Sequence, residues 1–427
     1  MTDAAHASPA THSSHAAVDA ACRSCGQALT QTVVDLGLSP VSNAFIKADD
    51  LALAETFYPL HAMVCQHCWL VQLRDATPAQ THFHDDYVYF SSYSSSWLEH
   101  AQRYVSTMTH RLGLNADSRV MELASNDGYL LQYFVQAGIP CLGVEPTANT
   151  AAAARTKGVD SRELFFGRDT AHALRQQGWE VDLLLGNNVL AHVPDINDFV
   201  GGMPLVLKAQ GVITLEFPHL LRLIEQNQFD TLYHEHYSYL SLSALEPVFA
   251  RAGLRVFDIE HLPTHGGSLR VFACHADANH ATRPSVAATL EEERVAGLRS
   301  AALYAGFAER VRKAKRDLLA FLIEARNAGK RIAAYGAAAK GNTLLNYCGA
   351  GTDFIDYVVD RNPTKQGRLL PGTRIPVVAP EQVFGDKPDY LLILPWNIKD
   401  EVIAQMAGIR EWGGRFVVAI PETAVLP

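Results

Sequence analysis

Two Cys-x-x-Cys pairs constrain the start of this chain more than any other feature. Cys22 and Cys25 form the first pair, Cys65 and Cys68 form the second, and 39 residues separate them. Each pair can direct two thiolates at one ion, and two pairs complete the tetrahedral set that Zn²⁺ prefers. The spacing predicts a small unit closed around a structural zinc ion, although His67 could replace one thiolate. A redox pair or two unrelated surface turns are the alternatives.

The composition favours a protein with several buried cores and small-molecule substrates. The chain has 427 residues, 48% hydrophobic and 19% charged, with a formal net charge of -9. Without a basic stripe, binding to nucleic acid is not expected. No stretch reaches the ~18 apolar residues of a membrane helix, and residues 1–20 lack the basic and apolar regions of a secretion signal. We expect a disordered tail at 1–20 and a cytoplasmic protein without membrane contact.

The middle of the chain contains the stretch SRVMELASNDGYLLQYFVQAGIPCLGVEP. Its periodicity predicts a buried strand at 120–123, a tight turn at 126–128, a helix at 129–136 and a second strand at 141–144. Glu145 follows that strand, about 17 residues after the turn, where an acid can bind an adenosine ribose. The stretch therefore indicates a βαβ unit with a nucleoside site.

The turn itself discriminates between two cofactors. In the acid-x-G-x-G-x-G pattern of S-adenosylmethionine (SAM) sites, Glu122 and Gly128 match, but Ala124 and Asn126 replace two glycines. An NAD site needs those glycines because the backbone must approach a pyrophosphate, which SAM lacks. The pattern favours SAM over NAD, and any other doubly wound α/β domain is the alternative. The candidate cofactor-binding residues are Glu122, Ala124, Asn126, Asp127, Gly128, Glu145, Pro146, Asn187 and Asn188.

The last third of the chain predicts a helical segment and a second α/β unit. Residues 284–330 have apolar positions near one helical face, with a break near Gly297 or Gly306. RIAAYGAAAKGNTLLNYCG then predicts a strand at 332–335, a loop and a helix, and FIDYVVD and YLLILPW predict two further strands. The order is that of a small parallel sheet.

The loop between Gly336 and Gly341 has the spacing of a P-loop. Asn342 and Thr343 stand where that motif requires Lys and Ser or Thr, so ATP hydrolysis is not expected. Lys340 at a helix N-terminus nevertheless suits an anionic diphosphate, because backbone N–H groups and the helix dipole point at it. A solvated lysine in an ordinary turn is the alternative.

The segment TLYHEHYSYLS places two histidines around one glutamate. If the segment is extended, His234 and His236 face one way and Glu235 faces the other. That arrangement suits a general base or a His-x-His metal site, and a structural role is equally compatible with the residues alone.

In combination these motifs resemble one family. The cysteine pairs are followed by YFSSYSSSW, ELASNDGYLLQ, GVEP, YHEHYSYLS, HGGSLRV, YGAAAKGNT and DRNPTKQG. This order resembles the SAM-dependent C-methyltransferases that act on nucleotide-linked keto-deoxysugars, over nearly the whole chain. The resemblance implies a zinc-binding domain at 21–78, a Rossmann-like SAM methyltransferase domain at 79–285 and a Rossmann-like α/β domain at 286–427 that helps to bind a dTDP-linked sugar. A monomer is expected.

The resemblance also implies roles for individual residues. His236 is the expected base that removes a proton from a ring carbon, with C3 the expected position, and the enolate is then methylated. Tyr233 polarises the keto group and Glu235 positions the sugar or the histidine. The candidate substrate-binding residues are Tyr87, His192, Gly336, Lys340, Asn342, Asp360, Arg361 and Trp396.

Other functions stay open at this point. C5-methylation of a related keto-sugar, or O- or N-methylation, would use the same cofactor. A zinc-knuckle protein that only binds nucleotides is the alternative that is not an enzyme. An oxidoreductase with two dinucleotide domains is less compatible, because neither turn carries Gly-x-Gly-x-x-Gly.

The zinc assignment makes the first testable prediction. Metal analysis of freshly purified protein that has not been exposed to a chelator should find about one zinc ion per chain, because structural zinc is bound tightly at neutral pH. Protein prepared in this way but free of zinc would contradict the assignment.

Overall fold

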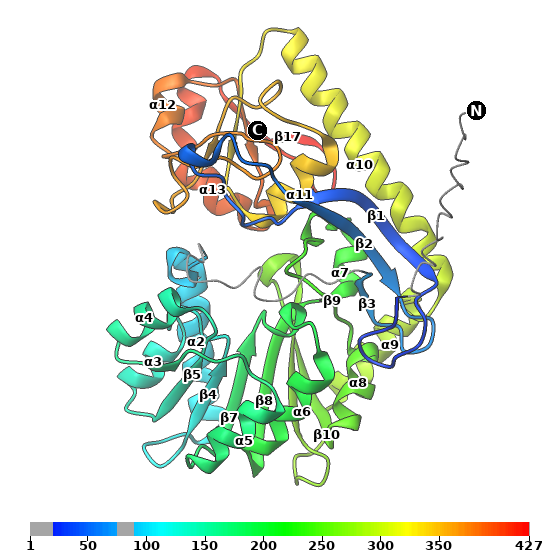
Figure 1. Cartoon of the computed structure of the whole chain (residues 1–427), viewed down its shortest axis with the longest axis vertical. Coiled ribbons are helices and arrows are strands. Elements are labelled where there is room, and N and C mark those ends of the chain that lie inside the picture. Colours follow the sequence, from blue (N-terminus) through cyan, green and yellow to red (C-terminus); the bar gives the residue numbers. More distant parts are fainter. Residues whose placement is uncertain (1–19, 75–88, 427) are drawn as a thin grey trace, which may run out of the picture.

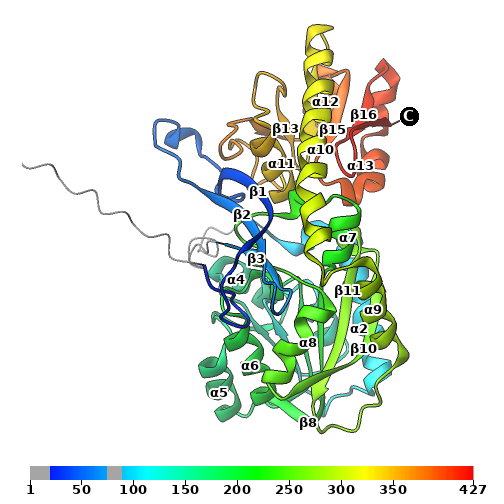
Figure 2. The same cartoon turned by 90° about the vertical axis from the view of Figure 1, so that its right-hand side faces the viewer.

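The computed structural model describes residues 20–74 and 89–426, which form two lobes and a smaller unit that joins them (Figure 1). The lower lobe in that view is the central part of the chain and the upper lobe is the C-terminal part. The N-terminal strands lie along one side and pack against both lobes, as the view turned by 90° also shows (Figure 2). The predicted class, α/β with a small N-terminal unit, is confirmed.

A seven-stranded sheet forms the centre of the lower lobe, in the order β10-β11-β8-β7-β4-β5-β6. β4 (Val120–Leu123) pairs in parallel with β5 (Cys141–Val144) on one side and with β7 (Val181–Asn187) on the other. The winding reverses between β4 and β7, and such a switch point is where doubly wound sheets bind ligands. The other strands are β6 (Asp160–Arg162), β8 (Leu207–Pro218), β10 (Leu254–Leu262) and β11 (Ser268–His275), of which β11 runs antiparallel to both β8 and β10.

Helices cover both faces of this sheet. On one face, Tyr104 and Met108 of α2 and Phe134 of α3 pack against the strands. Side chains of α5, α6 and α8 cover the other face. The helices are α2 (Ser95–Leu112), α3 (Leu131–Gln136), α4 (Ala148–Thr156), α5 (Arg168–Gln176), α6 (Ile196–Val206), α7 (Leu220–Glu225) and α8 (Leu242–Arg251).

The predicted βαβ unit is confirmed with one adjustment. Both predicted strands have the expected bounds, because four consecutive buried residues, all apolar or small except Glu122, suit a parallel strand covered on both faces. α3 begins at Leu131 rather than at Tyr129, since residues 129 and 130 still belong to the turn. Asn126 and Gly128 both have positive φ, as a tight turn requires.

The C-terminal lobe contains a six-stranded sheet in the order β14-β13-β12-β15-β16-β17. All neighbours are parallel except β16 and β17, and the winding again reverses beside the first strand, between β12 and β15. Only two residues of FIDYVVD form a strand. The elements are β12 (Ile332–Tyr335), α11 (Ala339–Cys348), β13 (Val358–Val359), β14 (Val377–Val378), α12 (Gln382–Asp386), β15 (Tyr390–Ile393), α13 (Lys399–Gln405), β16 (Arg415–Val418) and β17 (Ala424–Leu426).

The helical segment between the two sheets is a pair, α9 (Pro284–Ala296) and α10 (Ala301–Asn327). Gly297 ends α9 in the left-handed conformation with φ +85°, so it is the break, whereas Gly306 lies inside α10. α9 belongs by its contacts to the central lobe. Its buried Glu293 accepts hydrogen bonds from the first backbone N–H groups of α8.

The N-terminal unit is a sheet of four antiparallel strands in the order β1-β2-β3-β9. β1 (Gln31–Pro40), β2 (Phe57–Val64) and β3 (Val71–Leu73) come from this unit, but β9 (Ser238–Tyr239) comes from the central part of the chain. The N-terminal unit therefore does not close its own sheet.

The hydrophobic cores also connect the three units. Val33 and Leu60 of the N-terminal sheet share a core with α10 and the C-terminal sheet. Leu29 and Leu70, beside the cysteines, share a different core with the central lobe. The N-terminal unit consequently bridges the lobes and has no separate core of its own.

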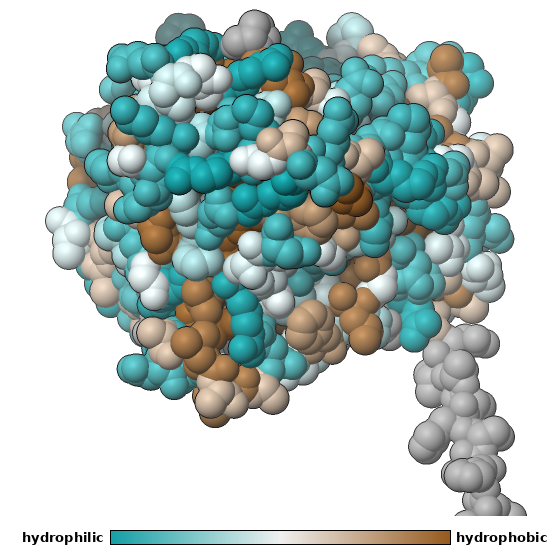
Figure 3. All heavy atoms as spheres, turned by 90° about the horizontal axis from the view of Figure 1, so that it is seen from above, coloured by the Kyte–Doolittle hydropathy of each residue, from teal (hydrophilic) through white to brown (hydrophobic). Residues whose placement is uncertain are grey.

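The face seen from above is mostly hydrophilic, with small separate apolar areas (Figure 3). None of the helices within residues 20–74 and 89–426 combines the length and the apolar character needed to cross a bilayer.

Candidate active site and metal centre

The four cysteines converge as predicted. Their Sγ atoms all lie within 4.8 Å of one another, with 3.5 Å between those of Cys22 and Cys68 and between those of Cys25 and Cys65. Zn–S bonds of about 2.3 Å would place tetrahedral sulfur atoms about 3.8 Å apart, so the donor set fits zinc. His67 is exposed and lies outside this cluster. A closed set of four thiolates leaves no position for substrate.

A cavity of about 1390 Å³ lies between the two lobes. Residues at the carboxyl ends of β4, β5 and β7 line one side, and residues that follow β12 and β15 line the other. Both switch points therefore open into the same space. A typical small-molecule pocket measures roughly 300–1,000 Å³, so this cavity has room for two ligands.

The side of the cavity that the sequence assigns to the cofactor is formed by strained turns. Ala124, Asn126 and Asn188 line the cavity with φ of +55°, +48° and +55°, which is unusual for residues other than glycine. Such strain is tolerated mainly where a site needs a particular backbone course. Glu145 and Asn187 lie beside them, and one carboxylate oxygen of Glu145 accepts a hydrogen bond of 2.9 Å from the backbone N–H of Asn126.

Six of the nine predicted cofactor residues line the cavity and three do not. The six are Ala124, Asn126, Glu145, Pro146, Asn187 and Asn188. Glu122 is fully buried behind the turn, where burial raises its pKa well above its ordinary value. Asp127 forms an ion pair with Lys157, and a Cβ at Gly128 would lie 3.1 Å from Ala154. These three residues shape the turn instead of lining the cavity.

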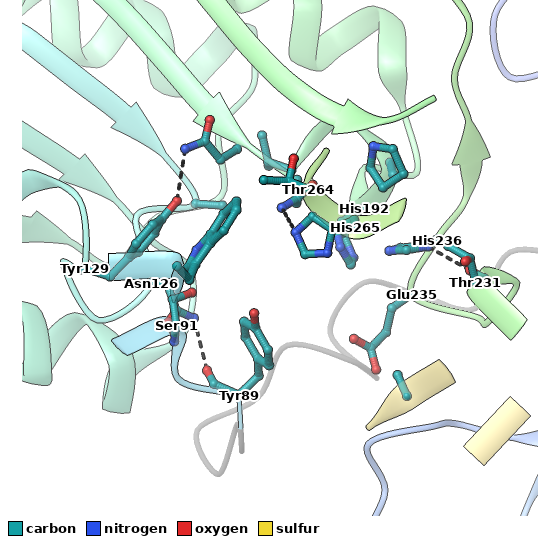
Figure 4. A pocket seen from close by; sticks show the side chains of 18 of the residues that line it. Tyr89, Ser91, Asn126, Tyr129, His192, Thr231, Glu235, His236, Thr264 and His265 are labelled. Carbon is teal, nitrogen blue, oxygen red and sulfur yellow. Dashed lines mark hydrogen bonds between the residues drawn. The ribbon is translucent and has the colours of Figure 1, made fainter. Parts of the chain in front are cut away.

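The opposite side carries the motif with two histidines. His236 Nδ1 lies 2.9 Å from the carbonyl oxygen of Thr231, and because a carbonyl only accepts, Nδ1 carries the proton. Nε2 is then the acceptor, and the Tyr233 hydroxyl donates to it at 2.7 Å. Figure 4 shows Tyr129 on one side of the cavity and His236 and Glu235 on the other.

The motif is not an extended segment. The backbone N–H of His236 donates to the carbonyl of Tyr233, so residues 233–236 form a tight turn. The turn separates the histidines: His234 points at the carbonyl oxygen of Pro59, 3.2 Å away, and does not line the cavity. Glu235 and His236 both line it. A His-x-His metal site is therefore not formed.

Glu235 is held by groups that come from other units. Its Oε1 accepts a hydrogen bond of 2.7 Å from the side-chain amide of Asn43, in the N-terminal unit. Lys365 of the C-terminal lobe also lines the cavity, and its charge acts on the same carboxyl group. Burial raises the pKa of Glu235 to about 7, while Asn43 and Lys365 oppose the shift.

Burial also decides the charge of the histidines. It lowers the pKa of His236 well below 6.5, and the neighbouring His192 adds to the effect. The rings of these two residues lie 4.6 Å apart between centroids, and burial lowers the pKa of His192 to about 4. His265, which accepts from the Asn188 amide at 2.9 Å, has a pKa of about 4 for the same reason. All three imidazoles are neutral at neutral pH.

Lys340 reaches the cavity from the first turn of α11. Its Nζ lies 3.2 Å from Asn397 Oδ1 and 4.7 Å from the centre of the Trp396 ring. Behind it, Trp396 Nε1 donates to Asp230 at 2.8 Å. Within residues 20–74 and 89–426, no carboxylate forms an ion pair with this ammonium group. Its charge is free to act on an anion in the cavity.

Five predicted substrate-binding residues support the C-terminal side without lining the cavity. Gly336 packs against Pro395, Asn342 is buried in α11, and Asp360 accepts from the backbone N–H of Ala337. Arg361 lies on the surface near Glu401, and Trp396 backs Lys340. Of the predicted set His192 and Lys340 line the cavity, and Tyr87 lies outside the described residues.

Several cavity residues were not predicted. Some of these residues lie inside the motifs on which the family resemblance rests, and that position could have identified them as candidate site residues. Asn43, by contrast, lies in a loop whose sequence carries no such signal. The missed residues are Asn43, Tyr89, Ser91, Trp97, His100, His265, Lys365 and Asn397.

Comparison with known proteins shows which families the chain resembles. Three family models match it: "Putative zinc binding domain" at residues 22–83, "Methyltransferase domain" at 97–259 and "C-methyltransferase C-terminal domain" at 263–421. The C-methyltransferase NovU of Streptomyces niveus is 39% identical over 408 residues, covering 95% of this chain and 96% of NovU.

More distant matches cover smaller parts of the chain. A ubiquinone biosynthesis O-methyltransferase of Rhodopseudomonas palustris is 27% identical over 23% of this chain and 40% of its own length. The solved magnesium protoporphyrin IX methyltransferase of Synechocystis with bound SAM is 14% identical, covers 41% of this chain and 79% of its own, and has a TM-score of 0.31, too low to bear on function.

NovU matches along nearly its whole length, and the zinc-binding, methyltransferase and C-terminal models follow one another in the order of the three structural units. The chain belongs to the family of SAM-dependent C-methyltransferases that includes NovU.

Proposed function

We propose that this enzyme transfers the methyl group of SAM to a ring carbon, C3, of a nucleotide-linked 4-keto-deoxysugar. The observation that carries the proposal is the shared cavity, in which a strained turn on the proposed cofactor side faces a neutral histidine and a half-buried lysine. The motif resemblance supports a nucleotide sugar as substrate, and a dTDP-linked sugar is the proposed form.

A ring carbon becomes nucleophilic only after it loses a proton. A neighbouring keto group permits this loss because the electron pair spreads onto its oxygen. The site therefore needs a base for the proton and a hydrogen-bond donor for the oxygen. When bound, SAM supplies an electrophilic methyl group to the carbon so activated.

His236 has the features of the base. Its Nδ1–H is held by the Thr231 carbonyl, so Nε2 faces the cavity unprotonated. In the structure the Tyr233 hydroxyl donates to that Nε2. On substrate binding, this hydroxyl would turn to the keto oxygen, which frees Nε2 for the proton and stabilises the enolate. Removing such a donor typically costs ~3–4 kcal/mol of transition-state stabilisation.

Lys340 and Glu235 would bind the rest of the substrate. Lys340 lies at the N-terminus of α11, where the helix dipole and its own charge both favour an anion, so it is the proposed partner of the diphosphate. One oxygen of Glu235 is held by Asn43, which leaves the other to accept from a sugar substituent.

The decisive experiment is incubation with SAM and a panel of dTDP-linked 4-keto-6-deoxysugars in D₂O. Formation of S-adenosylhomocysteine with a new C-methyl signal in the product NMR spectrum is expected. Without SAM, the same carbon should exchange its proton for deuterium, because the enolate still forms. Methylation on oxygen or nitrogen would contradict the proposal, and methylation at C5 would correct the position.

Replacement of the proposed base gives a second test. His236→Asn should lower turnover by ~10² or more, the usual scale for a lost general base, and should leave SAM affinity unchanged in calorimetry. His234→Asn is the matched control, since His234 lies two residues away outside the cavity, and it should keep turnover within a few-fold of the wild type. Near-normal turnover of His236→Asn would remove this residue from the role.

The pH profile separates Glu235 from His236. Since the pKa of Glu235 is about 7 and that of His236 is well below 6.5, Glu235 is the one of these two residues that titrates near neutrality. If its carboxylate binds substrate, kcat/KM rises with pH through about 7, as the carboxyl group loses its proton. Measured from roughly pH 5.5 to 9, Glu235→Gln should have a lower plateau without this limb. If kcat/KM of the variant still rises with pH through about 7, the rise belongs to another titrating group.

A further inference from the structure

The turn that carries His236 is attached to the N-terminal unit directly after the catalytic residue. The backbone N–H of Leu73 donates to the carbonyl of Tyr237 at 3.0 Å. β9 then pairs with β3, with Ser238 opposite Gln72. The chain returns to the central lobe only at Leu240, which forms a bridge to His219. The position of the turn thus depends on strand β3 of the N-terminal unit.

Arg23 connects the cysteine cluster to the same point. It lies between Cys22 and Cys25, so a metal bound by these cysteines also restrains the arginine backbone. Its Nη1 donates to the carbonyl oxygen of Leu73 at 2.7 Å and to that of Tyr237 at 3.0 Å. Its guanidinium carbon also lies 5.6 Å from the centre of the fully buried Tyr237 ring.

Gln72 makes a second connection. Its side chain is fully buried, and its Nε2 donates to the Sγ of Cys22 at 3.1 Å. Its Oε1 accepts from the backbone N–H of Arg23 at 2.8 Å. Hydrogen bonds to metal ligands of this kind orient the ligand and stabilise its charge. One residue therefore contacts a thiolate, the backbone of Arg23 and strand β9.

We infer that the zinc-bound cysteine cluster positions the catalytic turn, and that Arg23 and Gln72 transmit its geometry to Tyr237 and so to His236. The metal then contributes to catalysis without touching substrate. The inference rests on the proposed function only for the role of His236. Displacement of a reacting group by about 1 Å can lower a rate ~10²-fold, so small changes at Tyr237 are sufficient.

The packing predicts that metal loss acts locally. Leu29 and Leu70, beside the cysteines, belong to the core of the central lobe. The central sheet packs mainly against the helices of its own lobe. Zinc removal is therefore expected to loosen residues 231–241 and to leave the cofactor turn at 118–146 in place.

The test uses full-length Arg23→Ala, with Gln66→Ala as the matched control. Gln66 lies in the other cysteine pair, is exposed and bonds to Gln31, away from the turn. Arg23→Ala should retain about one zinc ion per chain and bind SAM with wild-type affinity. Its kcat should fall ~10- to 100-fold with little change in the KM for substrate. Its amide hydrogen exchange should rise in residues 231–241 only. Gln66→Ala should match the wild type, and Arg23→Lys should recover part of the rate.

Three results would overturn the inference: unchanged kcat and exchange in Arg23→Ala, a rise in exchange that extends equally through 118–146, or an equal effect of Gln66→Ala. If Arg23→Ala loses its zinc or fails to fold, the inference is tested on the wild-type protein instead. Its exchange is measured before and after zinc removal by a chelator, and protection lost first in 231–241 supports the inference, while protection retained there contradicts it. Exchange and zinc content need no turnover, so failure of the proposed sugar substrate would be recognised separately.

Discussion

The antiparallel pairing of β3 with β9 is the contact on which the arrangement of the three units depends. β9 contributes only two residues, but it leaves the central part of the chain to complete the N-terminal sheet. Since β1 packs on α10 and the cysteine cluster packs on the central lobe, this sheet is held at both ends. The pairing therefore determines where the two lobes face each other and encloses the cavity between their switch points.

Burial determines the chemistry that this cavity can perform. Three histidines with lowered pKa values are neutral, and Glu235, with a raised pKa, can be charged or neutral near pH 7. Burial lowers the pKa of Lys340, and the charge of Asp230, which is bonded to Trp396 behind the lysine, opposes this shift. Because a ligand that fills such a site would displace water from it, each hydrogen bond and charge would act more strongly on that ligand than it would at the surface.

Local patterns predicted local structure well. The strands at 120–123 and 141–144, the turn after β4 and the lysine at the start of α11 are all present, since each depends on neighbours within a few residues. The cysteine cluster is present because its two short Cys-x-x-Cys motifs, although 39 residues apart, can share one ion. Predictions that needed side-chain direction were less accurate. The motif around His236 forms a turn instead of an extended segment, and Gly128, Asn342 and Trp396 support the site from behind.

By itself, the sequence determined the cysteine cluster, the α/β class, the turn after β4 and, through its motifs, the family. Only the tertiary structure decided that Asn43, Glu235 and Lys365, from three separate units, meet at one cavity, and that the N-terminal sheet is completed by a strand beyond His236. The physical reason is that short-range periodicity encodes which face of an element is buried, whereas contacts between distant segments depend on how those buried faces pack together.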